Sequence, residues 1–290
     1  MSEALLEISN LVVDYPGRGF RARPFRALKG VSIDVRAGET VGLVGESGSG
    51  KSTLGRAVLG LAPVTEGSVR YCSEEIGHAT RGRRRQLASE IQVVFQDPYT
   101  SMNPSMTIRR ILLEPLIARG VRSRQAEGRA IELLDQVALP AHALDRLPRE
   151  FSGGQRQRIA IARALALDPK LVVCDEPVSA LDLSTQARVL ELLCDIQEQT
   201  GVAYLFISHD LAVVQHVSRR VAVMLSGEIV EQGEAWQVTT VPSHPYTQRL
   251  LLAAPVADPD AQALRRAERQ RLLSAAAFDR APTFDHGTVH

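Results

Sequence analysis

The stretch GESGSGKST, residues 45–53, decides the fold of this chain. It combines glycines, hydroxyl side chains and a single lysine, and it lacks any large apolar side chain that could enter a core. The preceding run TVGLV, residues 40–44, is apolar and contains β-branched residues, which is typical of a strand. The following residues, STLGRAVLGLAPV, place leucine and valine at helical spacing before Pro63. The stretch is therefore predicted to join a strand to a helix.

The spacing of Gly45, Gly50, Lys51 and Ser52 fits the P-loop pattern, which requires this strand–loop–helix setting. Backbone N–H groups of such a loop and the helix N-terminus attract phosphate, and glycine lets the backbone approach it. Lys51 is predicted to bridge the β- and γ-phosphates, and the Ser52 hydroxyl to ligate Mg²⁺. By chance alone, the bare pattern would occur in roughly one such chain per hundred. The predicted nucleotide-binding residues are Gly45, Glu46, Ser47, Gly48, Ser49, Gly50, Lys51, Ser52 and Thr53.

A second motif, LVVCDEP, places two carboxylates after an apolar run. Residues 171–174 predict a buried strand that delivers Asp175 and Glu176 at its carboxyl end, where open α/β sheets bind their ligands. Asp175 is a candidate partner of Mg²⁺ through water, and Glu176 is a candidate general base that polarises the attacking water. Taken alone, the motif is also compatible with a solvated acidic turn. Beside a P-loop, the catalytic interpretation is favoured.

The order of the predicted elements indicates an α/β fold. The runs LEISNLVVDY and VSIDV are typical of strands, and strands alternate with helices after residue 40, which implies parallel βαβ units. Residues from about 97 to 150 interrupt this alternation and predict a helical insert. Beyond about residue 235 lies a tail whose last part is rich in alanine and charged residues.

The composition limits the classes of function. Lys and Arg number 34 against 33 Asp and Glu, so no global field recruits nucleic acid or anionic lipid. The N-terminus does not resemble a signal peptide, and no run approaches the ~18 apolar residues of a membrane span. Three widely spaced cysteines disfavour a disulfide framework or a structural zinc site. We therefore expect a soluble intracellular protein, and we interpret the run RGRRR, residues 81–85, as a solvated loop rather than a nucleic-acid site.

The longest informative stretch, FSGGQRQRIAIARALALDPKLVVCDEPVSALD, resembles the nucleotide-binding subunit of ATP-binding-cassette (ABC) transporters. Further motifs follow in family order, from about residue 6 to residue 235. VVFQDP supplies a Q-loop at Gln96, SALD a D-loop that ends at Asp182, and FISHD a switch histidine at His209. The signature motif of the family corresponds to Ser152, Gly153, Gly154 and Gln155.

The resemblance implies a fold and a division into domains. We expect a P-loop NTPase with a RecA-like α/β core, formed by residues 1–96 and 156–235, that includes an N-terminal antiparallel β region. Residues 97–155 would form the helical subdomain that carries the signature. Residues 236–290 would be a C-terminal extension of the peptide-importer type.

The resemblance also implies a mechanism of ATP hydrolysis. Two such domains sandwich two ATP molecules head to tail, so that Ser152 and Gly154 contact the γ-phosphate held by the partner's P-loop. In this scheme Glu176, His209 and Gln96 are catalytic. The expected metal residues are Ser52, Gln96 and Asp175. Closure of the dimer depends on ATP, and hydrolysis reopens it.

The aromatic residue that stacks on adenine is less well marked. Such a residue usually lies upstream of the P-loop, and Tyr15 in VVDYPG is the candidate chosen from the sequence. Phe20 and Phe25 lie in the segment that follows and are alternatives.

Two further stretches, FQDPYTSMNPSMTIRRILLEPL and SHPYTQRLLLAAP, resemble the dipeptide/oligopeptide importer subfamily, which includes nickel importers. Residues 242–247 correspond to its C-terminal hallmark, whereas Met102 and Ser105 depart from the usual leucine and arginine. Some relatives bind an iron–sulfur cluster in the tail, but residues 251–290 contain no cysteine, so none is expected here.

The subfamily implies a function and partners. We expect an ATPase at the cytoplasmic face of the membrane that powers uptake of peptides or related small solutes. Its partners would be a second ATP-binding subunit, identical or not, two membrane permease subunits and an extracytoplasmic solute-binding protein, with no nucleic acid. Three alternatives stay open: an ABC ATPase that acts on DNA or ribosomes, an exporter motor, and a regulator that binds nucleotide without hydrolysing it.

Overall fold

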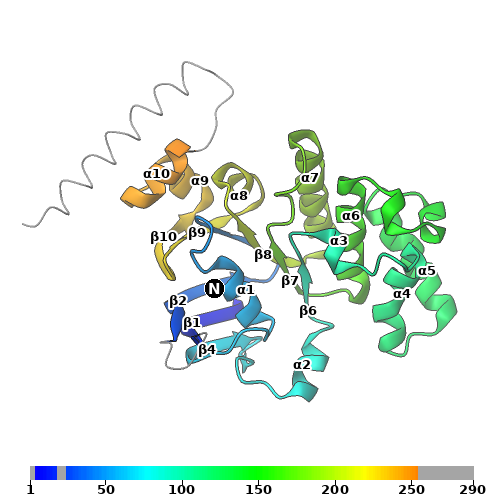
Figure 1. Ribbon diagram of the computed structural model, residues 1–290, viewed down its shortest axis with the longest axis horizontal. Helices are drawn as coiled ribbons and strands as arrows, with labels where there is room; N and C mark the ends of the chain where they lie inside the picture. Colours follow the sequence, from blue (N-terminus) through cyan, green and yellow to red (C-terminus); the bar gives the residue numbers. More distant parts are fainter. Residues whose placement is uncertain (1–3, 18–23, 254–290) are drawn as a thin grey trace, which may run out of the picture.

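The structure is a computed structural model that describes residues 4–17 and 24–253. An N-terminal antiparallel sheet has the strand order β2-β1-β4-β5. Its strands are β1 (Ala4–Tyr15), β2 (Phe25–Arg36), β4 (Glu66–Tyr71) and β5 (Glu74–Glu75). This sheet lies at one end of the molecule, opposite a group of helices (Figure 1).

A second, six-stranded sheet has the order β10-β9-β3-β8-β7-β6. The strands β6, β7, β8, β3 and β9 run parallel to one another, and β10 pairs antiparallel with β9. The bounds are β3 (Thr40–Val44), β6 (Ile91–Val94), β7 (Leu171–Asp175), β8 (Ala203–Ser208), β9 (Arg220–Leu225) and β10 (Glu228–Glu234).

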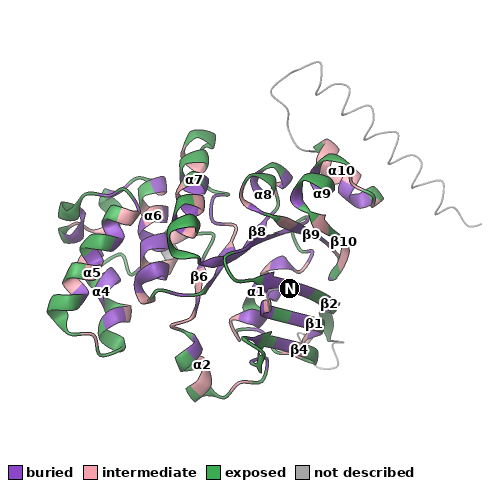
Figure 2. Ribbon diagram, turned by 180° about the vertical axis from the view of Figure 1, so that it is seen from behind, coloured by how far each residue is buried: buried purple, intermediate pink, exposed green. Residues whose placement is uncertain are grey.

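The central strands are covered on both faces, which explains their continuous apolar sequences. Side chains alternate between two cores: Tyr204 and Phe206 of β8 enter one, whereas Leu205 and Ile207 enter the other. The first core includes the helical region, and the second includes the N-terminal sheet and the helix α1 (Lys51–Val58). Figure 2 shows the buried strands running between these layers.

The strand order brings distant parts of the chain to one edge. Val44 at the end of β3 is in register with Ser208 of β8, and Asp175 of β7 is in register with Ile207. Val94 of β6 is in register with Cys174. Because these strands are parallel, the segments that follow all four of them emerge at the same edge of the sheet.

Between β6 and β7 the described elements are all helical. They form a separate group to one side of the six-stranded sheet (Figure 1). The α-helices are α3 (Pro98–Ser101), α4 (Ile108–Ala118), α5 (Ser123–Gln136) and α6 (Gly153–Ala164), and the 3₁₀ helices are η1 (Ala141–Asp145), η2 (Pro148–Glu150) and η3 (Leu165–Leu167).

The remaining helices pack around the sheets. They are α2 (Arg81–Leu87), α7 (Leu183–Thr200), α8 (Leu211–Val217), α9 (Ala235–Thr240) and α10 (Pro245–Ala253). The RGRRR run lies in α2, so its interpretation as a loop is wrong. Thr80 caps this helix by accepting a hydrogen bond from Arg83 N–H, a local signal that the sequence analysis overlooked. None of the helices among the described residues combines the length and apolar character that a bilayer crossing requires.

An ion-pair network connects the two sheets. Arg220 at the start of β9 contacts Asp34 of β2 at 2.9 Å and Glu39 at 2.8 Å. The Glu39 carboxylate also accepts a hydrogen bond from the backbone N–H of Arg36. Hydrogen bonds to Glu39 and Asp34 raise the pKa of Arg220 above its ordinary value, so this guanidinium stays charged. The network holds the end of β2 against the six-stranded sheet.

Candidate functional site

The glycine-rich loop begins at the end of β3 and leads into α1, as the sequence predicts. Gly50 is the N-cap of α1, with φ at 111°, and Gly48 has φ at 80°. A Cβ on Gly48 would meet nothing within 4 Å, so this glycine leaves space on the open side of the loop. A Cβ on Gly45 would instead lie 2.2 Å from the carbonyl oxygen of Met224. Gly45 is therefore required by the neighbouring strand β9, not by the approach of a ligand.

The turn between β9 and β10 holds the back of the loop. The N–H of Gly227 donates to the carbonyl of Ser49 at 2.8 Å, and the N–H of Lys29 donates to the carbonyl of Gly227 at 2.9 Å. Gly227 thus links the loop to β2. This link brings the first residues of β2 beside the loop.

Lys51 is almost completely buried in the loop. It is 4% exposed, and its Nζ donates to the carbonyl oxygens of Gly45 at 2.7 Å and Glu46 at 2.9 Å. A lysine has three N–H donors, so one remains for a ligand. Burial lowers the pKa of Lys51, and the nearby carboxylates of Glu176, Asp175 and Glu46 oppose this effect. The ammonium is thus aligned by the loop itself.

Ser52 and Asp175 lie together at the edge of the sheet. The Ser52 hydroxyl donates to Asp175 Oδ1 at 2.9 Å. Burial raises the pKa of Asp175, which the Ser52 hydrogen bond opposes and the Glu176 carboxylate reinforces. Mg²⁺ in nucleotide sites usually has one or two protein ligands, and phosphate oxygens and waters complete its octahedron. A hydroxyl and a carboxylate at hydrogen-bond distance beside a phosphate loop fit such an ion.

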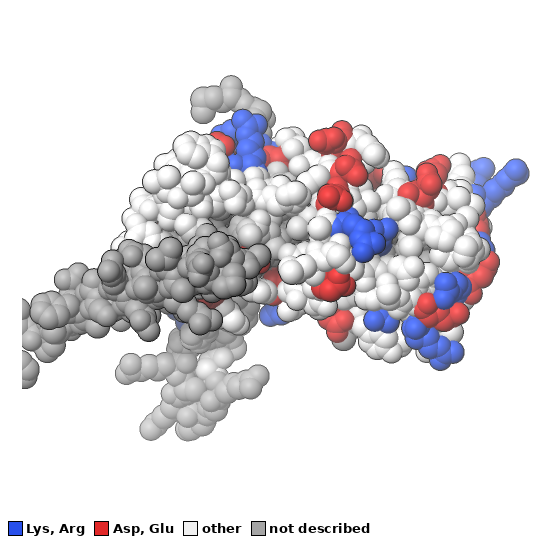
Figure 3. Space-filling view, turned by 90° about the horizontal axis from the view of Figure 1, so that it is seen from above, with Lys and Arg blue, Asp and Glu red and all other residues white. Residues whose placement is uncertain are grey.

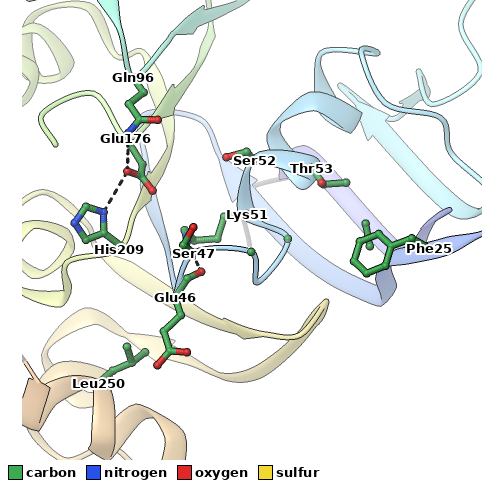
Figure 4. A pocket seen from close by; sticks show the side chains of 13 residues that line it. Phe25, Glu46, Ser47, Lys51, Ser52, Thr53, Gln96, Glu176, His209 and Leu250 are labelled. Atoms are coloured by element: carbon green, nitrogen blue, oxygen red, sulfur yellow. Dashed lines mark hydrogen bonds and ion pairs between the residues drawn. The ribbon is translucent and has the colours of Figure 1, made fainter. Parts of the chain in front are cut away.

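Glu176 lies at the centre of the predicted catalytic residues. Its Oε2 accepts a hydrogen bond from Gln96 Nε2 at 3.3 Å and lies 3.2 Å from His209 Nδ1 (Figure 4). The three side chains follow β7, β6 and β8, so the strand order brings them together. The backbone of Glu176 has φ at 50°, and its N–H donates to the carbonyl of Ile207 at 2.9 Å. The left-handed conformation turns the chain away from the strand and directs this carboxylate towards the loop.

Lys51, Ser52 and the three side chains of Gln96, Glu176 and His209 line one open pocket of about 760 Å³. Pockets that bind small ligands typically measure about 300–1,000 Å³. The P-loop forms the floor of the pocket. The side chains of Gln96, Glu176 and His209, here called the Glu176 cluster, lie on one side, and Phe25 lies on the other (Figure 4). The lining residues are Phe25, Ala27, Glu46, Ser47, Gly48, Gly50, Lys51, Ser52, Thr53, Gln96, Glu176, His209 and Leu250.

Not every predicted binding residue lines this pocket. Gly45 and Ser49 of the loop and the predicted metal residue Asp175 do not line it, and Ser49 is buried. Tyr15 pairs with Phe25 across β1 and β2, but it packs against the second core and does not line the pocket. Phe25 is 65% exposed and does line it. Phe20 lies outside the described residues.

The pocket also contains a residue that the sequence analysis did not place there. Leu250 of α10 belongs to the C-terminal stretch SHPYTQRLLLAAP. This stretch resembles the importer subfamily, but nothing in its sequence predicts a contact with the nucleotide pocket. Periodicity and spacing carry no information about which distant helix packs against a loop. Only the folded chain brings α10 to the P-loop.

The predicted signature residues lie at the start of α6. Ser152 and Gln155 form a capping box: Ser152 Oγ accepts from the N–H of Gln155, and Gln155 Oε1 accepts from the N–H of Ser152. Ser152 is exposed, and the helix N-terminus is therefore available to an anion from another molecule. These residues do not line the pocket of their own chain.

Asp182 supports the signature helix indirectly. It caps α7 by accepting hydrogen bonds from Ser184 Oγ at 2.7 Å and Thr185 N–H at 3.0 Å. These hydrogen bonds hold the pKa of Asp182 well below its ordinary value. A Cβ on Gly154 would lie 2.2 Å from Thr185 Cγ2, so the start of α6 packs directly on this capped end of α7.

A P-loop after a central parallel strand, together with a carboxylate pair after a second strand, defines a P-loop nucleotide-binding protein. The sequence also matches one particular family within this class. Residues 28–179, more than half of the chain, match the ABC transporter family, and the chain belongs to this family.

Curated relatives and solved structures are consistent with this assignment. The chain is 47% identical over 277 residues to the glutathione import ATP-binding protein GsiA of Pectobacterium atrosepticum, which covers 94% of this chain and 44% of that protein. It is 50% identical over 234 residues to the oligopeptide transport ATP-binding protein OppD of Mycobacterium bovis, which covers 81% of this chain and 38% of that protein. The chain spans less than half the length of these relatives.

A dimeric structure of the ATP-binding cassette MJ0796, bound to ADP and Pi, superposes with a TM-score of 0.71 at 29% identity. It covers 79% of this chain and 98% of that one. The α/β fold of a P-loop NTPase predicted from the sequence is thus confirmed, as is the resemblance to ATP-binding subunits of peptide importers. The predicted domain boundaries, and the roles of the individual site residues, stay predictions.

Proposed function

We propose that this chain is the ATP-hydrolysing subunit of an importer for peptides or related small solutes. The observation that carries the hydrolysis is the meeting of Gln96 and His209 at one oxygen of Glu176 in the same pocket as Lys51. A binding protein needs only the phosphate loop. A carboxylate held by two further polar side chains beside the loop is suited to act as the general base of hydrolysis. The similarity to glutathione import and oligopeptide transport ATP-binding proteins supports import of such solutes.

The loop and its surroundings bind the nucleotide. The N–H groups of residues 47–53 and the free donor of Lys51 would contact the phosphates. Ser52, Asp175 and Gln96 would hold Mg²⁺, which neutralises phosphate charge when bound. Phe25 takes the adenine-stacking role in this proposal, because it lines the pocket and Tyr15 does not.

Glu176 then acts as the general base. It would accept a proton from the water that attacks the γ-phosphorus, while ADP leaves. Gln96 and His209 hold Oε2 in place and orient the water. His209 would also contact the γ-phosphate.

Hydrolysis would require a second subunit. Ser152 is exposed at a helix N-terminus and lies outside its own pocket, so the natural place for it is a pocket on a partner. The relative solved as a dimer supports this arrangement. Ser152 and Gly154 would contact the partner's γ-phosphate, and Asp182 would hold the end of α7 that supports them.

The membrane permeases would dock beside Gln96. A groove of about 400 Å³ lies between β6 and the helices α4 and α6, and the exposed Phe95 lines it. Phe95 directly precedes Gln96, so a segment in this groove would contact the residue next to the catalytic side chains.

The surface charge favours no nucleic-acid partner. Figure 3 shows a face where charges of both signs are interspersed, with no dominant basic patch. The relatives named as a glutathione import and an oligopeptide transport ATP-binding protein support a peptide-like solute. A solute-binding protein would be a further partner, and the chain would act at the cytoplasmic face of the membrane.

The first test is ATP binding by the purified full chain. Lys51→Ala removes a buried charge that contacts the phosphates, and we expect the Kd for ATP to rise roughly ten- to hundredfold, from about 1.5–3 kcal/mol per hydrogen bond to a charged group. Lys170→Ala changes a lysine whose side chain is 63% exposed at the other end of β7 and is the matched control. Equal ATP affinity in the wild type and Lys51→Ala would contradict the proposal. Uptake of labelled glutathione or oligopeptide by the reconstituted complex tests the solute class.

A further inference from the structure

The last helix of the described residues, α10, contacts the P-loop through one buried side chain. Tyr246, in the first turn of α10, is 3% exposed, and its hydroxyl accepts a hydrogen bond from the backbone N–H of Glu46 at 2.9 Å. Leu250 follows four residues later and lines the nucleotide pocket on the same side as Glu46 (Figure 4). This helix therefore forms one wall of the site.

The hydrogen bond from Glu46 acts on the same peptide group that Lys51 contacts. The carbonyl of Gly45 and the N–H of Glu46 belong to one planar unit and point in opposite directions. Lys51 Nζ donates to that carbonyl at 2.7 Å, and Tyr246 accepts from that N–H. Rotation of this peptide would break both hydrogen bonds together. Tyr246 thus determines the position of an acceptor that aligns Lys51.

The position of Tyr246 is itself set by β10. Both carboxylate oxygens of Glu231 accept hydrogen bonds from the turn before α10, from the N–H of Ser243 at 2.7 Å and from the N–H of His244 at 3.1 Å. His244 Nδ1 accepts from the N–H of Tyr246 at 3.2 Å. Burial raises the pKa of Tyr246, although the N–H of Glu46 opposes this, so the phenol stays neutral at pH 7. A chain of hydrogen bonds thus runs from Glu231 to the P-loop.

We propose that Tyr246 is a positioning residue of the ATP site: it fixes the Gly45–Glu46 peptide so that Lys51 is aligned for the phosphates. The C-terminal hallmark segment is then a working part of the nucleotide site rather than a separate appendage. This inference rests on the proposed ATP-binding function. The inference requires that Tyr246 affect the binding of the nucleotide's phosphates and not the binding of its adenosine part.

The test is the removal of one hydroxyl. In Tyr246→Phe the ring stays and the Glu46 N–H loses its partner, and we expect the Kd for ATP and ADP to rise three- to tenfold, which is about 0.7–1.4 kcal/mol at 1.4 kcal/mol per tenfold. The affinity for adenosine, which lacks phosphate, should stay unchanged. In ATPase assays of the assembled complex, KM should rise. The value of kcat should stay within about twofold of the wild-type value, because Tyr246 does not contact Gln96, Glu176 or His209.

The matched control is Tyr204→Phe. Tyr204 is 2% exposed in β8, and its hydroxyl has no hydrogen-bond partner among the described residues. The same chemical change should therefore leave nucleotide affinity at the wild-type value. Melting temperatures of both variants show whether the fold is retained. If Tyr246→Phe does not fold, Glu231→Gln tests the same hydrogen-bond chain one step further from the loop, with about a twofold rise in the Kd for ATP expected.

A double-mutant cycle separates positioning from general destabilisation. Glu231→Gln should weaken ATP binding in the wild type but have no further effect in Tyr246→Phe, because it acts through that residue. Wild-type ATP affinity in Tyr246→Phe, or an equal loss for adenosine and ATP, would overturn the inference. Additive effects of the two changes would also overturn it. Absence of ATP binding by the wild type would instead refute the proposed function.

Discussion

The replacement Glu176→Gln tests the proposed chemistry most directly. The two side chains have nearly the same shape, and the backbone conformation at φ 50° is unchanged, so its strain is common to both. The amide oxygen can take the place of Oε2, 3.3 Å from Gln96 Nε2 and 3.2 Å from His209 Nδ1. What is lost is the capacity to accept a proton. The change is therefore expected to act on the chemical step and not on the fold.

The magnitude follows from the role of a general base. Such a base contributes about 10²–10⁴ to the rate. At 1.36 kcal/mol per tenfold, this corresponds to about 2.7–5.4 kcal/mol of transition-state stabilisation. The free energy of unfolding should change by less than about 0.5 kcal/mol, as for substitutions that leave packing intact. ATP binding should be retained, and the ATP-bound dimer should accumulate because it cannot reopen.

The assay measures phosphate release at saturating ATP, together with ATP affinity and the size of the assembly. Glu198→Gln, at an exposed position of α7, is the matched control and should hydrolyse ATP at the wild-type rate. Near-normal hydrolysis by Glu176→Gln would refute the assignment of the base. Loss of ATP binding in this variant would show that Glu176 acts in binding instead.

Five other substitutions probe the remaining parts of the site. Phe25→Ala should weaken ATP binding roughly five- to hundredfold, from a stacking contribution of about 1–3 kcal/mol per base, whereas Tyr15→Ala should have the smaller effect; the reverse order in nucleotide titrations would restore Tyr15 as the platform. Ser152→Arg should leave ATP binding to the single chain unchanged but abolish hydrolysis in the assembly, and full activity there would argue against a site shared between subunits. Gly48→Ala should lower the free energy of unfolding by about 1–2 kcal/mol, because the backbone of Gly48 is left-handed. Gly45→Ala should lower the melting temperature more than Gly48→Ala does, because the new Cβ would lie 2.2 Å from the carbonyl oxygen of Met224. Equal melting temperatures of the two glycine variants would contradict this reading of the loop.

The local motifs were predictable from the sequence because they are contiguous. A P-loop contains its own phosphate ligands within nine residues, and LVVCDEP contains both a strand and the carboxylates at its end. The arginine-rich run was wrongly interpreted as a loop, because the interpretation relied on its charges and not on Thr80, the residue that caps the helix. The helix α2 there depends on a hydrogen bond at its first turn and on the burial of Leu87.

Which aromatic residue lines the pocket, and so is proposed to stack on adenine, was not predictable in the same way. Tyr15 and Phe25 are neighbours across two antiparallel strands, and only the twist and packing of that sheet decide which of them faces the pocket. The Gly227 turn and the Arg220 network hold β2 beside the loop, and both depend on contacts between distant segments.

By itself, the sequence determined the phosphate loop, the carboxylate pair and the α/β class, since each depends on residues adjacent in the chain. The tertiary structure alone decided that Gln96 and His209 meet at Glu176, because strand order is a property of the whole sheet. It alone decided that Tyr246 of α10 contacts Glu46, two hundred positions away in the chain. The physical reason is the same in both cases: side-chain hydrogen bonds reach only about 3 Å, and packing of the entire core brings the partners within that distance.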